Sequence, residues 1–314
     1  MPFAYCKIVE HFTDAKTVVA FVSVGHSTAS VCIAAFTSSG AELLAEVSDP
    51  DLGGRDMDVL IAQHFAKIFE KQHGINPLEN IKAKLKLEDQ AERTKKILSA
   101  NSETSFAVEC LLEDRDISGL ITRELFEELC AASFKPALVK LLQQAVAISE
   151  VRDGCLVAYA CIAFVEAVGG CTRIPWVQRC VSEVFGKEIS RTLAGDECVA
   201  RGCALQAAMA SLHFKVKEFD FAEKLWRPIC IRWTGEAPVA IASCSQQQEQ
   251  QQQQQTEGAA VASCQEIELP IGTPTNTMRK ITFIRSCPLE LHATYKDLEG
   301  KTRAADLGNA FFIS

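Results

Sequence analysis

Three apolar runs stand close together near the start of the chain and limit its possible folds more than any other feature. They read VVAFVSV, SVCIAAF and ELLAEV, all within residues 17–47, and short segments at 25–28 and 38–40 separate them. Glycine and small polar residues between apolar runs are typical of tight turns between strands. This segment therefore predicts a meander of three strands.

Helical and strand patterns alternate after the meander. The spacing of apolar residues, the stop at Gly74 and the proline at position 175 predict the next elements. A further helix should begin at the N-cap residue Thr122, and Pro136 should kink it. The other expected elements are helices over 56–73, 80–100, 175–185 and 196–211, a hairpin over 106–121 and a strand over 164–168. This alternation indicates an α/β unit.

The pattern changes after His213. Apolar and polar residues alternate with a period of two in FKVKEFDF, PICIRW, KITFIR and LELHATY, as in half-buried strands. Residues 235–266 interrupt this pattern and contain nine glutamines in Gln246–Gln248 and Gln250–Gln255. Because such a tract buries little apolar surface, we expect residues 235–266 to be disordered.

Composition excludes several classes of protein. With 48% apolar and 23% charged residues the chain can build a core. A net charge of −8 with no basic stripe argues against a nucleic-acid partner. The longest apolar run, residues 155–165, is too short to span a membrane. The fourteen cysteines lack C-x-x-C spacing and the six histidines do not cluster, so we expect no metal site. Scattered cysteines and the lack of a secretory signal pattern favour the cytoplasm.

Two glycine-containing turns are candidate phosphate or nucleoside sites. Gly25-His26-Ser27-Thr28 joins two apolar strands, and backbone N–H groups in such a turn can form a nest for an anion. The segment 169–175, GGCTRIP, lies between a strand and a helix, where glycines allow close backbone approach. Taken alone, each segment is more often an ordinary tight turn.

A charged helix face is the third candidate. Glu92, Lys95, Lys96 and Ser99 recur at helical spacing and should lie on one face of one helix. The alternative is a surface ion pair between Glu92 and Lys96. Cys171 is interpreted as a packing residue.

Taken together and in order, these strings resemble the 70-kDa heat-shock chaperone superfamily, whose nucleotide domain has the actin fold. The strings are VGHST, LGGRDMD (52–58), ERTKKILSAN (92–101), VGGCTRIP (168–175) and DECVARGCALQAA (196–208). His26-Ser27, LSAN and RGCALQ look most similar to the 110-kDa branch. The resemblance covers about residues 17–234 and resumes near Thr277.

The resemblance implies a nucleotide site for ATP or ADP, with magnesium in the family. In the family, the charged helix and the second Gly-Gly loop enclose the adenosine, and the other glycine turns approach the phosphates. The corresponding cofactor-binding residues here are Gly25, His26, Ser27, Thr28, Gly53, Gly54, Glu92, Lys95, Lys96, Ser99, Gly169, Gly170, Cys171, Arg173, Ile174 and Asp196. No residue is assigned a catalytic role.

The chain departs from the family pattern at several places. Ser23 stands where the family has an aspartate that helps to arrange magnesium and water. The first phosphate loop and its lysine should precede Thr17, where only sixteen residues are found, and the helical lid does not follow. Residues 152–163 look like an insertion. We therefore expect an internal piece or a truncated gene product, without ATPase activity of its own.

The alternation of elements predicts an α/β fold. The resemblance implies that residues 17–213 are the second lobe of an actin-like ATPase domain, after an unassigned segment (1–16) and before a partial β-sandwich (214–314). The implied function is that of a 110-kDa-type chaperone, which acts as a nucleotide-exchange co-chaperone and holds unfolded protein. Its implied partners are 70-kDa chaperones and unfolded polypeptides, with no nucleic acid and no membrane. The alternatives are an ATP-hydrolysing foldase and a fragment without function.

Overall fold

The chain divides into two compact units, residues 1–221 and 222–314, and each is described by itself. The computed structural model describes residues 1–2, 4–5, 14–152, 159–211, 213, 220–222, 225, 228–234, 240–243, 264–270, 273, 275, 279–282, 289–296, 302–303 and 311–313.

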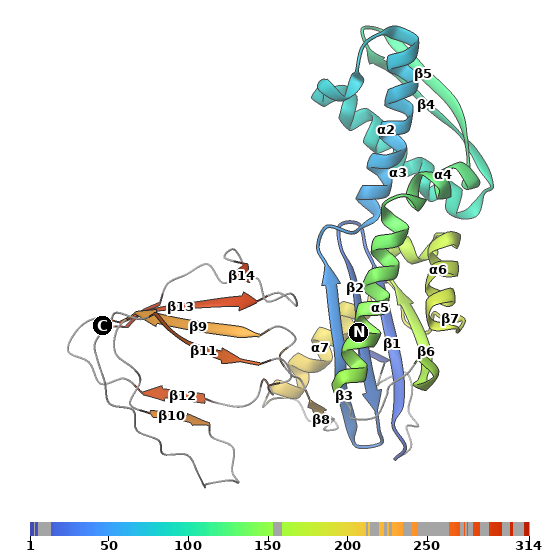
Figure 1. The fold of residues 1–314 in the computed structure, drawn as a ribbon. Helices are drawn as coiled ribbons and strands as arrows, with labels where there is room; N and C mark the ends of the chain where they lie inside the picture. Colours follow the sequence, from blue (N-terminus) through green and yellow to red (C-terminus); the bar gives the residue numbers. More distant parts are fainter. Residues whose placement is uncertain are drawn as a thin grey trace. The chain divides into compact units, whose positions relative to one another are not determined.

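The first unit is built on one mixed sheet (Figure 1). Strands β1 (Thr17–Val24), β2 (Ala29–Phe36) and β3 (Gly40–Asp49) pair antiparallel in chain order, which confirms the predicted meander. Strand β6 (Ile162–Val168) runs parallel to β1, and β7 (Ile189–Ser190) runs parallel to β6. The short strand β8 (Asp220–Ala222) lies next to β3 at the other edge.

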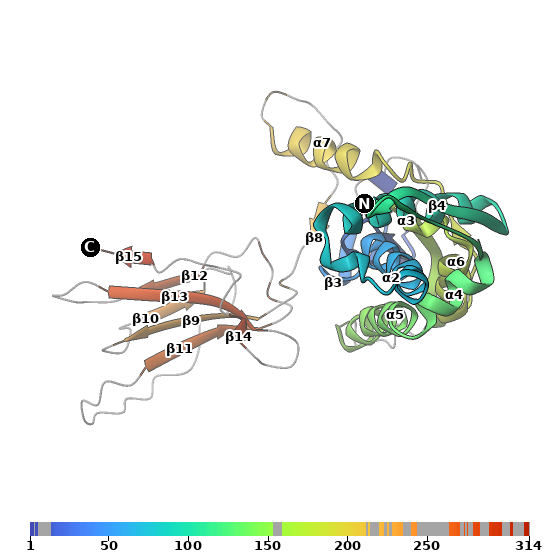
Figure 2. The same cartoon turned by 90° about the horizontal axis from the view of Figure 1, so that it is seen from above.

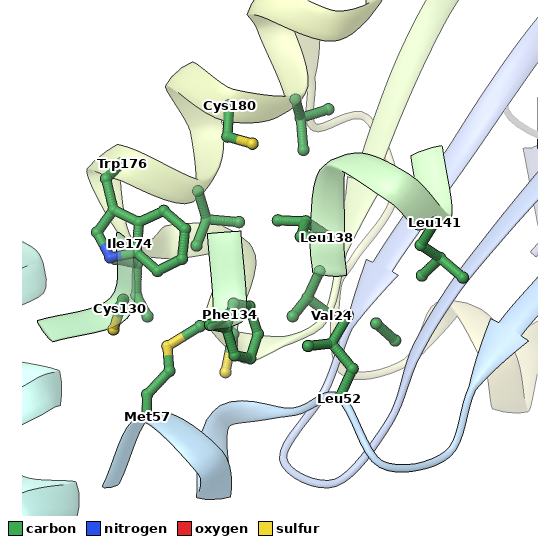
Figure 3. Packing of buried hydrophobic residues seen from close by; sticks show 14 of the residues in the cluster. Val24, Leu52, Met57, Cys130, Phe134, Leu138, Leu141, Ile174, Trp176 and Cys180 are labelled. Atoms are coloured by element: carbon green, nitrogen blue, oxygen red, sulfur yellow. The ribbon is translucent and has the colours of Figure 1, made fainter. Parts of the chain in front are cut away.

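Helices cover both faces of this sheet. Figure 2 shows α5 (Phe134–Arg152) and α7 (Cys198–Ala210) on opposite sides of the strands. Helix α6 (Pro175–Phe185) packs beside α5, and the Phe134 and Trp176 rings meet edge to face at 5.8 Å (Figure 3). Successive side chains of β1 and β2 point to opposite faces of the sheet, and most are buried on both faces. Their burial is favourable because apolar surface is removed from water.

A second group of elements extends from the carboxyl end of β3 (Figure 1). It consists of helix α2 (Gly54–His73), the 3₁₀ turn η1 (Pro77–Glu79), helix α3 (Ile81–Ala100), the hairpin of β4 (Glu103–Leu112) and β5 (Arg115–Thr122), and helix α4 (Arg123–Ala131). The Asn80 side chain accepts hydrogen bonds from the first N–H groups of α3, so the helix begins where a good N-cap residue stands. Phe65 of α2 stacks on Phe106 of β4 at 3.8 Å. The predicted helices 56–73 and 80–100 and the hairpin are confirmed.

One prediction in this region is wrong. The sequence predicted a single helix from Thr122 kinked at Pro136, but the structure has two helices, α4 and α5, which are separated at residues 132–133. Pro136 lies in the first turn of α5. A proline is tolerated there because the N–H groups of a first turn have no partner within the helix.

The predicted insertion at 152–163 spans the end of α5 and the start of β6, and it stays a prediction. Arg152 ends α5, residues 159–161 form the 3₁₀ turn η2 (Tyr159–Cys161), and Ile162 already pairs with Val18 as the first residue of β6. Residues 153–158 lie outside the described residues. The strand therefore begins two residues before the predicted strand 164–168.

The second unit consists of two small antiparallel sheets among its described residues. One orders β11 (Cys264–Leu269), β9 (Ile229–Thr234), β13 (Leu289–Lys296) and β14 (Thr302–Arg303), with β15 (Phe311–Ile313) also on β13. The other pairs β10 (Ala240–Ser243) with β12 (Arg279–Thr282).

The prediction of disorder over 235–266 is wrong at two described stretches within it. Residues 240–243 form β10, and β11 begins at Cys264. Residues 240–243 pair with β12 and residues 264–269 pair with β9, so pairing with a neighbouring strand orders them despite the low complexity of the surrounding sequence. The glutamines at 246–255 lie outside the described residues, as does most of FKVKEFDF, whose last two residues belong to β8 in the first unit.

Candidate functional site

Three turns from distant parts of the sequence meet at one carbonyl oxygen, that of Gly25. The backbone N–H of Gly54 donates to it at 2.9 Å, and the Cys171 thiol donates to it at 3.2 Å. These atoms belong to the turns between β1 and β2, between β3 and α2, and between β6 and α6. The structure thus brings together three of the strings that sequence analysis singled out separately.

The β1–β2 turn is exposed and has backbone donors without an acceptor among the described residues. Gly25 N–H closes the turn on the Thr28 carbonyl at 2.9 Å, and His26, Ser27 and Thr28 are exposed. Within the part of the chain that the structure describes, the N–H groups of His26 and Ser27 have no acceptor. Adjacent free N–H groups suit an anion, so this turn fits a phosphate.

The Gly53-Gly54 pair allows the turns to pack against one another. A Cβ at Gly53 would lie 2.4 Å from the His26 carbonyl oxygen, and one at Gly54 would lie 2.4 Å from the Cys171 sulfur. The first amides of α2 are also used here, since Gly54 N–H and Arg55 N–H donate to the carbonyls of Gly25 and His26. The start of α2 is therefore bonded to the β1–β2 turn.

The second glycine pair has one constrained and one open residue. Gly169 has φ +91° and its Cβ would lie 2.5 Å from the Val24 carbonyl oxygen, whereas nothing lies within 4 Å of a Cβ at Gly170. The N–H of Gly170 has no acceptor among the described residues. Gly170 and Arg173 are exposed, and Ile174 is buried beneath them. A planar group could therefore approach the backbone at Gly170.

Cys171 faces inward. Burial raises the pKa of its thiol, so the thiol stays neutral and serves as a hydrogen-bond donor to Gly25. This environment suits the packing role that the sequence suggested.

Of the four residues predicted to share a charged face of α3, three do so: Glu92, Lys96 and Ser99. Lys96 and Glu92 form an ion pair of 2.7 Å whose side chains are 70% and 42% exposed, as expected for the surface pair that was the alternative reading. The hydrogen bond from Lys96 holds the pKa of Glu92 below its usual value. Ser99 is half-buried and donates to the Lys95 carbonyl at 3.1 Å.

Lys95 does not lie with the other three residues. Its side chain is 7% exposed, and its ammonium donates to Asp58 Oδ2 at 2.6 Å and to the Gly54 carbonyl at 2.8 Å. Helical spacing placed the four residues on one face, but the face is wide enough for Lys95 to point toward α2. A buried cation requires a partner, and Asp58 supplies it.

Sequence analysis missed Asp58. The signal was present, because Asp58 lies between the core residues Met57 and Ile61 at a buried position of an amphipathic helix. A carboxylate at such a position needs a compensating charge or hydrogen bond.

The segment before α7 lies beside the second glycine pair. A Cβ at Gly195 would lie 3.7 Å from the Gly169 nitrogen, and Asp196 next to it is exposed. Buried Glu166 of β6 holds this segment by accepting hydrogen bonds from the N–H and hydroxyl of Thr192 at 3.1 and 2.7 Å. Glu166 is a second residue that sequence analysis did not single out.

Ser23 is half-buried near the end of β1, two residues before Gly25. Within the described ranges, no group of three or more metal-ligating side chains comes together. The described helices include none that is long and apolar enough to cross a membrane.

The family model described as "Hsp70 protein" matches residues 10–260. The chain belongs to the Hsp70 family. This match confirms the resemblance seen in the sequence, and the mixed α/β first unit is consistent with an actin-like ATPase domain fragment of that family.

Similar proteins include members from plants and animals. The chain is 35% identical over 284 residues to "Heat shock 70 kDa protein 14" of Arabidopsis thaliana. The matched region covers 89% of this chain and 31% of that protein. It is 36% identical to the "97 kDa heat shock protein" of Strongylocentrotus purpuratus, over 89% of this chain and 28% of that protein. It is 39% identical to human "Heat shock 70 kDa protein 4", and that match covers 72% of this chain and 26% of that protein. These relatives support the 110-kDa-like branch, and the chain spans about a third or less of their length.

Proposed function

We propose that this chain contributes one side of a nucleotide-binding site for ATP or ADP. The observation that carries the proposal is the convergence of three turns on Gly25 beside a polar helix face, with backbone donors left without acceptors in the described residues. The family membership supports the same ligand.

The phosphates are assigned to the β1–β2 turn. The free N–H groups of His26 and Ser27 and the hydroxyls of Ser27 and Thr28 would hold phosphate oxygens, with Gly53 and Gly54 behind them. Magnesium would arrive with the phosphates. The Ser23 hydroxyl carries no charge to hold that cation, so we propose binding without hydrolysis by the described residues.

The nucleoside is assigned to the groups on either side of that turn. Glu92, Lys96 and Ser99 of α3 would face one side of it, and Gly170, with Arg173, the other. Cys171 and Ile174 support this turn from below, and Asp196 would approach the ribose. Lys95 is the predicted residue that we now place beneath the site rather than in contact with the nucleoside.

In cells, we propose that the protein acts as a chaperone of the 110-kDa-like branch. It would exchange nucleotide on 70-kDa chaperones and hold unfolded polypeptides, in the cytoplasm. The names of its relatives as heat-shock proteins support a chaperone role. The serine at position 23 favours the co-chaperone over an ATP-hydrolysing foldase.

Calorimetric titration of the 314-residue chain with MgADP tests the nucleotide proposal. We expect weak but measurable binding, which Lys96→Ala abolishes because it removes the exposed cation from the nucleoside side of α3. Lys84→Ala is the matched control, since Lys84 and Glu88 form the same kind of exposed i,i+4 pair on α3 at 3.8 Å. Absence of binding to the unaltered chain, or equal loss in both variants, would contradict the proposal.

A further inference from the structure

A buried ion pair ties the two halves of the candidate site together. Lys95 Nζ lies 2.6 Å from Asp58 Oδ2 and 2.8 Å from the Gly54 carbonyl, with both side chains at least nine-tenths buried. Lys95 belongs to α3, which carries the nucleoside-facing residues, and Gly54 belongs to the first turn of α2. The pair therefore joins the nucleoside side to the phosphate side.

The connection reaches the phosphate turn in one further step. The N–H of Gly54 donates to Gly25 and that of the next residue, Arg55, donates to His26, at 2.9 and 2.7 Å. A Cβ at Gly54 would also lie 3.1 Å from Lys95 Nζ, so the ammonium fills the space directly beneath this backbone. Movement of Lys95 would consequently shift Gly54 and, through it, the β1–β2 turn.

Stability alone does not account for this pair. The cost of removing two charges from water roughly offsets their attraction, and an apolar pair of similar volume would serve a core at least as well. Asp58 Oδ1 also has no partner among the described residues. Burial raises the pKa of the Asp58 carboxyl, and the Lys95 ammonium opposes that rise. Such a pair is better suited to fixing one geometry than to adding stability.

We propose that Asp58 is a positioning residue. By holding Lys95 beneath Gly54, it fixes the Gly53-Gly54 turn against the β1–β2 turn and keeps the ammonium off the exposed face of α3. Phosphate binding then depends on Asp58, while nucleoside contacts fall to Glu92, Lys96 and Ser99. The ligand part of this inference rests on the proposed nucleotide function, whereas the positioning part does not.

Two measurements on the full chain test the proposal, with Asp58→Asn as the variant. The first is hydrogen exchange at the amides of Gly54 and Arg55, which report the contact between α2 and the turn without any ligand. We expect their exchange to quicken at least about ten-fold in Asp58→Asn. The control is Thr94→Val, which alters the neighbouring buried side chain of α3 and should leave both amides unchanged.

The second measurement separates the two parts of the ligand. Pyrophosphate and adenosine are titrated individually, and Asp58→Asn should weaken pyrophosphate binding at least about ten-fold while changing adenosine binding less than about two-fold. A merely structural role would weaken both ligands equally or neither.

Should Asp58→Asn not fold, the double variant Asp58→Asn/Lys95→Met removes both charges and leaves no unpaired buried ammonium. It should show the same two changes. Unaltered exchange at Gly54 and Arg55 in a folded variant would overturn the positioning role. If the unaltered chain binds neither pyrophosphate nor adenosine, the nucleotide proposal fails, and the exchange measurement still decides the role of Asp58.

Discussion

At the residue scale, two adjacent glycines have different reasons to be glycine. Gly169 has a positive φ and lies against the Val24 backbone, so any side chain there strains the turn and collides with β1. Gly170 has open space where its side chain would be. Gly169 is therefore required by packing, whereas the backbone at Gly170 is accessible to a ligand.

This difference predicts opposite results for two similar substitutions. Gly169→Ala should lower the free energy of unfolding by about 1–3 kcal/mol, because of backbone strain and the contact with the Val24 carbonyl. Gly170→Ala should change it by less than about 0.5 kcal/mol. Urea denaturation of both variants measures the difference, and equal destabilisation would show that the turn is not held as described.

At the element scale, one arginine completes the end of α3. Arg123 Nε donates to the Leu98 carbonyl at 2.9 Å, and a terminal guanidinium nitrogen donates to Asn101 at 2.8 Å. The last carbonyls of a helix have no partner within it, so a side chain from α4 supplies one. The hairpin between α3 and α4 thus returns to the helix end from which it started.

Removal of this contact should be measurable. Arg123→Met should cost about 1–2 kcal/mol of stability, because two hydrogen bonds to carbonyls at the end of α3 are lost while most of the apolar stem is retained. Arg93→Met, at an exposed position of the same helix, is the control and should cost less than about 0.5 kcal/mol. Thermal unfolding of the two variants gives the comparison. If Arg123→Met lost no more stability than Arg93→Met, the stabilising role of Arg123 at the end of α3 would be contradicted.

At the scale of the whole molecule, buried neutral thiols link stability to pH. Burial raises the pKa of the Cys130 thiol to about 12, and burial also raises the pKa of Cys171 and Cys180. An unfolded cysteine ionises near pH 8.5. Between these values only the unfolded chain releases the proton, so rising pH favours unfolding.

The stabilising effect of Cys130 is complete below about pH 8.5 and is lost as the pH rises toward about 12, at about 1.4 kcal/mol per pH unit. Cys130→Ala should therefore show a shallower decline of stability between pH 8 and 10 than the unaltered chain. Cys203→Ala, at an exposed thiol, should not alter the slope. Denaturation series at several pH values test this, and identical slopes in all three proteins would refute it.

The elements were largely predictable because their signals are local. Apolar runs bounded by turn residues located β1 to β3, and apolar periodicity located α2. Gly74 and Pro175 marked helix ends that the structure confirms. The errors arose where local signals were ambiguous. Pro136 was taken for a kink when it lies in a first turn, and the residues around the glutamines were taken for disorder when strand pairing orders residues 240–243.

By itself, the sequence determined the alternation of strands and helices and the family, since periodicity and ordered motifs are properties of the chain alone. Only the tertiary structure decided what each motif contacts. It turned Lys95 inward to Asp58, assigned Gly169 to packing and Gly170 to the surface, and joined three turns at Gly25. The physical reason is that helical spacing fixes a direction around one helix, but burial and charge pairing depend on the element packed against it, which lies elsewhere in the sequence.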